Sequence, residues 1–202
     1  MIKRFNAIYK LNHTIKFFGL KPNANSYLRK SFASITDNAN DPILKAQKNY
    51  TLGVSKWNLD DFKGAKEYFQ LSINDFPTSD AYYNLANLEQ MDGNHLLALE
   101  HWKESLKLCP RSDAHVNIAN VLTIKLQNRT DALVHYKEAL KLSPEDGEIH
   151  YNYAVVLDSM GQLESAIDEY TIAINLGIEM AEKNLRNAKA KLIASKAEQT
   201  KA

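Results

Sequence analysis

Residues 82–110 read YYNLANLEQMDGNHLLALEHWKESLKLCP, and this stretch decides the fold. Ala86 is followed after twelve positions by Ala98, after four more by Trp102 and after eight more by Pro110. This four-residue motif, which we call the repeated phrase, recurs as Gly53–Ala65–Phe69–Pro77. It recurs again as Ala119–Ala132–Tyr136–Pro144, with one extra residue in its first gap, and as Ala154–Ala166–Tyr170–Ile178, without the proline. The second alanines of the copies lie 33, 34 and 34 residues apart. A fixed period of this length indicates a stack of identical structural units.

The residue types of the phrase predict two antiparallel helices per unit, each with an apolar face that the next unit covers. The small residue of the first helix and the alanine of the second lie where the two helices approach most closely. The aromatic residue, four positions after the alanine, is on the same face and fills the remaining space. The proline ends the second helix because it has no N–H and its ring clashes with the preceding turn.

Four such copies in register resemble the tetratricopeptide repeat family. The best copy carries the family's motif residues Tyr82, Leu85, Ala86, Ala98, Trp102, Ser105 and Pro110. The resemblance covers residues 44–178 and implies an all-α fold, a right-handed α-solenoid of four helix pairs. The repeats are expected at about 46–78, 79–111, 112–146 and 147–178.

Residues 179–197 are predicted to form a further helix that caps the solenoid. Ala181, Leu185, Ala188 and Leu192 lie on one stripe, and the other faces are charged. A solenoid needs such a terminal element to cover its last apolar interface. Residues 198–202 are expected to be a flexible tail.

Turn residues support the helix pairs. Asp60, Asn94 and Thr130 stand where second helices are expected to begin, and all are good N-cap types. Gly93 and Gly161 lie between paired helices, where a C-cap glycine is common. The third unit has no such glycine, so we expect a slightly longer loop or helix there.

The N-terminal segment differs from the repeats in composition. Residues 1–36 contain no Asp or Glu but seven basic residues, interleaved at first with apolar and aromatic ones. Residues 1–34 therefore resemble a mitochondrial targeting presequence, with a processing site near Arg29. Lys10 and Lys16 interrupt any apolar core that a secretory signal would need. The alternatives are a disordered basic arm and an extra helix packed on the solenoid.

Charge and composition exclude several classes of protein. Residues 31–202 carry 18 basic and 24 acidic residues, a net charge of −6, which argues against a nucleic-acid partner. The longest uncharged apolar runs fall short of the roughly 20 residues that span a bilayer, so no transmembrane segment is predicted. Cys109 is the only cysteine, which excludes an internal disulfide.

No catalytic, metal or cofactor site is predicted. None of the six histidines forms an H-x-x-x-H pair or pairs with cysteine at zinc-ligand spacing. The chain contains no glycine-rich phosphate loop and no G-x-S-x-G elbow. The protein is therefore predicted not to be an enzyme.

The resemblance implies a concave groove, lined by the first helix of each pair, that receives a partner's peptide. Asn84, Asn117 and Asn152 stand two residues before the small residue, and Asn87 and Asn120 one residue after it. On a helix the two positions share a face, and an amide can pair with both the N–H and the C=O of a peptide unit. This set resembles the asparagine ladder of superhelical tetratricopeptide scaffolds. The alternative is that these asparagines bond within or between repeats.

Aromatic residues beside the ladder are predicted to provide contact area for the peptide: Tyr50, Trp57, Tyr83 and Tyr151. The alternative is that the tyrosines belong partly to the core. Chaperone-binding members of the family hold a carboxylate with lysines and an arginine, but the corresponding sites here carry tyrosine, Asp113 or Glu148. A carboxylate-clamp chaperone partner is therefore not expected.

These observations predict a scaffold that binds a protein, or an extended peptide segment of one, in the groove. With the presequence, they predict a mitochondrial adaptor, in the matrix, that assembles or maintains a multisubunit complex. Two alternatives stay open: a permanent structural subunit of a large mitochondrial complex, and a cytosolic or outer-membrane-peripheral adaptor whose N-terminus is not a presequence. Because the ladder would contact backbone, the sequence names no client.

Overall fold

The computed structural model describes residues 41–199; the predicted presequence and residues 200–202 lie outside the described residues. The described part consists of nine helices without a strand. They are α3 (Pro42–Trp57), α4 (Phe62–Asp75), α5 (Ser79–Met91), α6 (His95–Leu108), α7 (Ser112–Ile124), α8 (Arg129–Leu142), α9 (Gly147–Ser159), α10 (Leu163–Asn175) and α11 (Ala181–Gln199).

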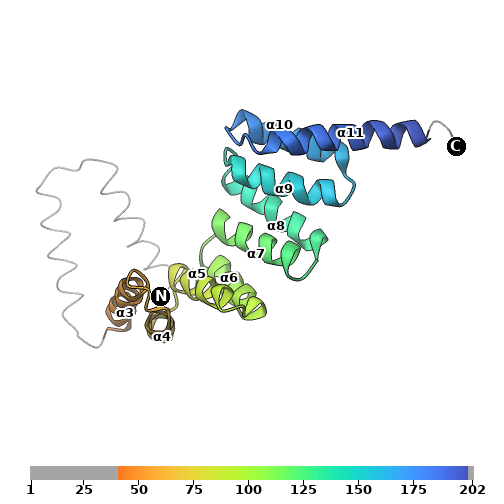
Figure 1. Cartoon of the computed structure of the whole chain (residues 1–202). Helices are drawn as coiled ribbons and strands as arrows, with labels where there is room; N and C mark the ends of the chain where they lie inside the picture. The colour runs from red at the N-terminus through yellow and green to blue at the C-terminus, as the bar shows by residue number, and fades with distance from the viewer. Residues whose placement is uncertain (1–40, 200–202) are drawn as a thin grey trace, which may run out of the picture.

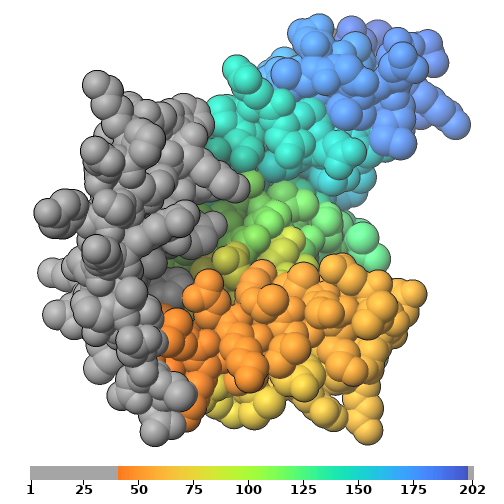
Figure 2. Space-filling view, turned by 90° about the vertical axis from the view of Figure 1, so that its left-hand side faces the viewer, coloured from red at the N-terminus to blue at the C-terminus, as the bar shows by residue number. Residues whose placement is uncertain are grey.

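The helices pack in consecutive pairs: α3 with α4, α5 with α6, α7 with α8 and α9 with α10. The pairs follow one another in sequence order along one curved stack (Figure 1). Figure 2 shows the same order, from the first pair in orange to α11 in blue. α11 packs on α10 and also contacts α9 at the end of the stack. The predicted all-α solenoid of helix pairs is confirmed.

The seam inside each pair is closed by the small and aromatic residues of the repeated phrase. All seven alanines of the phrase have 0% exposure, and the four aromatic residues are buried: Phe69, Trp102, Tyr136 and Tyr170. A Cβ atom added to Gly53 would lie 2.7 Å from the Phe69 ring. The first helix therefore needs glycine at this position, because the aromatic ring fills the space that a methyl group would occupy.

Two of the predicted N-caps are wrong. α4 is capped by Asp61, whose Oδ1 accepts a hydrogen bond from the Gly64 amide at 2.9 Å. Asp60, predicted for this role, has a φ of 58°, the left-handed conformation that Gly93 has in the next pair. α8 is capped by Asn128 instead of Thr130, and Asn94 precedes α6 without a capping bond.

The helix bounds differ slightly from those expected. α3 begins at Pro42 rather than near residue 46, because Asp41 accepts a capping hydrogen bond from the Ile43 amide. α11 begins at Ala181 rather than 179, after a turn that contains Gly177 with a φ of 93°. The loop between α7 and α8, residues 125–128, is one residue longer than those of the second and fourth pairs and equal in length to residues 58–61 of the first pair.

A candidate peptide-binding face on the first helices

The first helix of each pair contributes to one side of the stack, which we call the first-helix face. Hydrogen bonds between tyrosine and asparagine join neighbouring first helices across it. In each, an asparagine Nδ2 donates to a tyrosine hydroxyl of the preceding pair: Asn84 to Tyr50 at 3.2 Å, Asn117 to Tyr83 at 3.3 Å and Asn184 to Tyr151 at 3.1 Å. Asn184, on α11, was not among the predicted residues.

A second set of bonds ties the face to the aromatic residues inside the pairs. Asn87 Oδ1 accepts from Trp102 Nε1 at 3.0 Å, and Asn120 Oδ1 accepts from the Tyr136 hydroxyl at 2.6 Å. Buried Trp and Tyr side chains need a partner for their polar tip. Burial raises the pKa of Tyr136 to about 12, so this hydroxyl keeps its proton and donates. In the first pair the aromatic residue is Phe69, and Val54 stands where the asparagine would be.

Four of the five predicted ladder asparagines are therefore bonded within the protein, as the alternative interpretation expected. Each keeps part of its amide open, since its bonds use only the oxygen or only the nitrogen of the group. Asn152 is the exception, because it has no hydrogen bond to any other residue within 41–199. The ladder's role towards a client remains a prediction.

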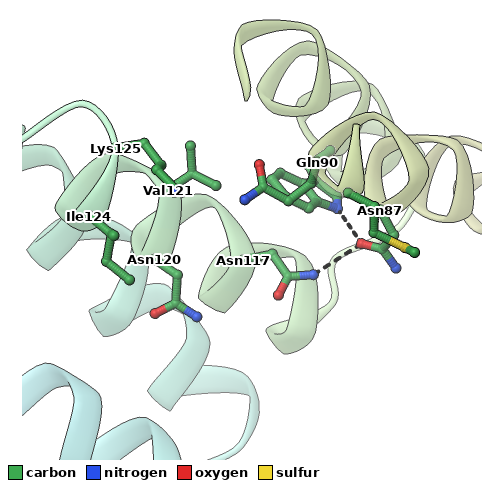
Figure 3. Close-up of a pocket in the computed structure, with 9 residues that line it drawn as sticks. Asn87, Gln90, Asn117, Asn120, Val121, Ile124 and Lys125 are labelled. Carbon is green, nitrogen blue, oxygen red and sulfur yellow. Dashed lines mark hydrogen bonds between the residues drawn. The ribbon is translucent and has the colours of Figure 1, made fainter. Parts of the chain in front are cut away.

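A pocket of about 360 Å³ lies between α5 and α7 on this face (Figure 3). Its polar lining consists of the amides of Asn87, Gln90, Asn117 and Asn120 and the ammonium group of Lys125. Its apolar lining consists of Met91, Trp102, Val121 and Ile124. Figure 3 shows Asn87 and Asn117 pointing towards each other, and their side chains bond at 3.2 Å. The pocket offers amide hydrogen-bonding groups beside an apolar wall.

Three of the predicted groove residues line this pocket, namely Asn87, Asn117 and Asn120. The others lie elsewhere on the stack: Tyr50, Trp57, Tyr83, Asn84, Tyr151 and Asn152. Met91, Ile124 and Lys125 were not predicted as lining residues. They lie near the ends of α5 and α7, and the repeat spacing alone does not show that these two ends enclose a pocket.

The predicted groove aromatics are half-buried and pack on their neighbours. Tyr50 lies on Phe69 with ring centroids 5.7 Å apart, and Trp57 contacts the same ring at 6.3 Å. The Arg111 guanidinium stacks 3.9 Å above the Tyr83 ring and bonds Asp80 and Asp113. These side chains therefore belong partly to the packing between repeats, as the second interpretation held.

One pair of histidines lies where the first and second helices of the third pair meet. His115 and His135 lie with their Nδ1 atoms 3.0 Å apart. Tyr82 and His101 hold the equivalent places in the preceding pair, with ring centroids 5.9 Å apart. The regular separation of 19 or 20 residues between such partners is the signal that would have identified the histidine pair. Among the described residues, no cluster of three or more His, Cys, Asp or Glu could hold a metal ion.

Comparisons with known proteins agree with the geometry. Residues 49–79 and 124–173 each match a tetratricopeptide repeat family. No curated protein sequence matches the chain. Among solved structures, YrrB, described as a tetratricopeptide protein with an unusual peptide-binding site, is 18% identical and superposes with a TM-score of 0.67. That match covers 79% of this chain and 82% of YrrB.

Two further solved structures show the same fold. MamA from Desulfovibrio magneticus RS-1 is 19% identical with a TM-score of 0.66, over 76% of this chain and 88% of MamA. The Cut9–Hcn1 hetero-tetramer of APC/C matches at 21% identity and a TM-score of 0.62, over 71% of this chain and 30% of that one.

The chain therefore contains tetratricopeptide repeats and folds as a tetratricopeptide solenoid. This fold indicates a protein–protein interaction scaffold. Within residues 41–199, no helix combines the length and the apolar character needed to cross a membrane.

Proposed function

We propose that the protein is a non-enzymatic adaptor that binds an extended segment of a client protein on the first-helix face. The observation that carries this proposal is the pocket between α5 and α7, with four amides beside an apolar wall. Amide groups pair with the N–H and C=O of an extended backbone, and the apolar wall provides area for a client side chain. The partly open amides of Asn87 and Asn120 suit this use, because bonds to the oxygen of each hold its side chain in place and leave its NH₂ group open.

The cellular role in this proposal is assembly or maintenance of a mitochondrial multisubunit complex, in the matrix. It is supported by the basic, acid-free N-terminal segment, whose composition is that of a targeting presequence. A permanent subunit of such a complex would use the same face, but would co-purify stoichiometrically at high salt.

Peptide selection tests the binding proposal directly. A 12-residue random library displayed on phage would be selected on the wild-type chain, and the tightest peptide labelled for fluorescence anisotropy. Ile124 is 68% exposed at the pocket, so Ile124→Asp should weaken binding at least tenfold without unfolding the chain. Ile193 on α11 is 71% exposed and lies outside the pocket, so Ile193→Asp is the matched control. The proposal fails if no peptide is selected or if both variants bind like the wild type.

The location has its own test. The C-terminally tagged protein would be purified from cell fractions and its N-terminus sequenced. We expect it in the mitochondrial fraction, starting near residue 30. An intact Met1 on the purified protein would contradict the presequence, and would leave the cytosolic or outer-membrane-peripheral adaptor.

A further inference from the structure

One junction in the stack lacks the bond that joins the others. A tyrosine–asparagine bond links α3 to α5, α5 to α7 and α9 to α11. Between α7 and α9 the tyrosine position holds Val116, and the asparagine position holds Asn152. We call this the open junction. Valine has no hydrogen-bonding atom in its side chain, so Asn152 has no tyrosine hydroxyl to bond here.

The side chains at the open junction are held by apolar packing. Val116 is half-buried and packs against the core cluster that contains Tyr136 and Tyr153. The stack therefore continues across the junction without the polar bond. This leaves the half-buried Asn152 with a donor and an acceptor that no residue within 41–199 uses.

The neighbouring junction shows what the missing tyrosine changes. There Asn117 donates to both Tyr83 and Asn87, and so its amide plane is fixed. At the open junction the residue equivalent to Asn87 is Asn120, which gives its oxygen to Tyr136 and keeps its NH₂ group. An open Asn152 amide and a partly open Asn120 amide thus belong to the same junction.

We propose that Asn152 is the anchor for the client's backbone, and that Asn84 and Asn117 serve mainly to join repeats. This rests on the proposed function and names the residue that recognises the peptide. A free carboxamide can turn so that its oxygen accepts from a peptide N–H while its nitrogen donates to the C=O of the same residue. Asn84 and Asn117 cannot turn in this way without breaking the bonds that link their helices. The ligand is a peptide unit, so the anchor fixes the position of the chain and the pocket selects side chains.

Two asparagine variants separate the two roles. With the phage-selected peptide as probe, Asn152→Ala should bind about tenfold more weakly or worse, with an unchanged Tm. Asn117→Ala should show the reverse, a lower Tm and a smaller loss of affinity. Val116→Tyr would supply the missing tyrosine hydroxyl for Asn152, so the Tm should rise while the affinity for the peptide falls.

A backbone scan of the peptide tests the contact itself. Each residue of the probe would be N-methylated in turn, which removes one N–H. One such change should weaken binding to the wild type about tenfold and leave binding to Asn152→Ala unchanged, because that bond is already absent there. A purely structural role of Asn152 would not produce this coupling.

The outcomes also distinguish this inference from the proposed function. If Ile124→Asp weakens binding but Asn152→Ala stays within twofold of the wild type, the anchor is overturned and the adaptor stands. If no peptide binds the wild type, both are overturned.

Discussion

Two kinds of helix contact hold this solenoid together, and they depend on different interactions. We call the contact inside each helix pair the volume seam and the contact between neighbouring first helices the hydrogen-bonded seam. Inside each helix pair, a small residue faces a buried aromatic ring, and apolar volume fills the seam. Between neighbouring first helices, side-chain hydrogen bonds such as Asn84 to Tyr50 join three of the four junctions. The volume seam tolerates no gap, so every repeat has it. The hydrogen-bonded seam contributes less to stability, so one junction can lose its bond and leave an amide for another use.

The largest effect is expected from emptying the volume seam. Trp102 is 1% exposed, and Trp102→Ala should lower the free energy of unfolding by about 3–5 kcal/mol. The measurement is chemical denaturation followed by circular dichroism. Trp102→Phe is the control, since it keeps most of the volume and loses only the bond to Asn87. If both variants lose equal stability, the hydrogen bond and not the volume closes this seam.

Overfilling the same seam should have the next largest effect. A Cβ atom at position 53 would meet the Phe69 ring at 2.7 Å. Overpacking costs about 1–3 kcal/mol and alanine gains about 1 kcal/mol in a helix, so Gly53→Ala should be destabilising by up to about 2 kcal/mol. The penalty should shrink in a Phe69→Leu background, where a flexible side chain replaces the ring. An alanine that stabilises the otherwise wild-type chain would contradict this close approach.

The hydrogen-bonded seam should respond more weakly. The bond from Asn184 to Tyr151 links the capping helix α11 to α9. In a double-mutant cycle with Asn184→Ala and Tyr151→Phe, we expect a coupling of about 0.5–1.5 kcal/mol by thermal denaturation. The equivalent pair at the open junction, Asn152→Ala with Val116→Ala, should show no coupling. A coupling there as large as that in the cap would remove the difference between the junctions.

The smallest effect concerns pH and comes from the histidine pair between α7 and α8. Burial lowers the pKa of His115 and of His135 in the folded protein. In the unfolded chain each histidine has the ordinary pKa of about 6.5, so the unfolded chain binds protons at a higher pH than the folded protein does. Stability should therefore be complete above about pH 6.5 and should decrease as the pH falls through that value towards the folded pKa. Denaturation midpoints between pH 7.5 and 5.5 measure this decrease. His135→Gln should reduce it, and an unchanged pH profile in that variant would contradict the assignment.

The fold was predictable because the volume seam depends on residue size at fixed spacing. Gly53 and Phe69 are recognisable in the sequence, since the same spacing of sixteen positions between a small residue and an aromatic one recurs with Ala86 and Trp102. The caps were harder to assign. Asp60 and Asp61 are both good cap types, and only the backbone conformation, with a φ of 58° at Asp60, distinguishes them.

The candidate site was predictable in part. The repeat positions place Asn87, Asn117 and Asn120 on one side of the stack, and all three line the pocket. Whether an asparagine is bonded or open depends on what stands opposite it in the neighbouring pair. That partner, Tyr83 for Asn117 and Val116 for Asn152, lies 34 or 36 residues earlier in the chain.

By itself the sequence determined the helix pairs, their order and the residues that fill the volume seam, because these follow from spacing along a regular helix. Only the tertiary structure decided which amides bond to which tyrosines, where the pocket lies, and that one junction is left without its bond. A hydrogen bond requires two atoms to meet within a few tenths of an ångström. That distance is set by how the helix pairs stack, which no single repeat encodes.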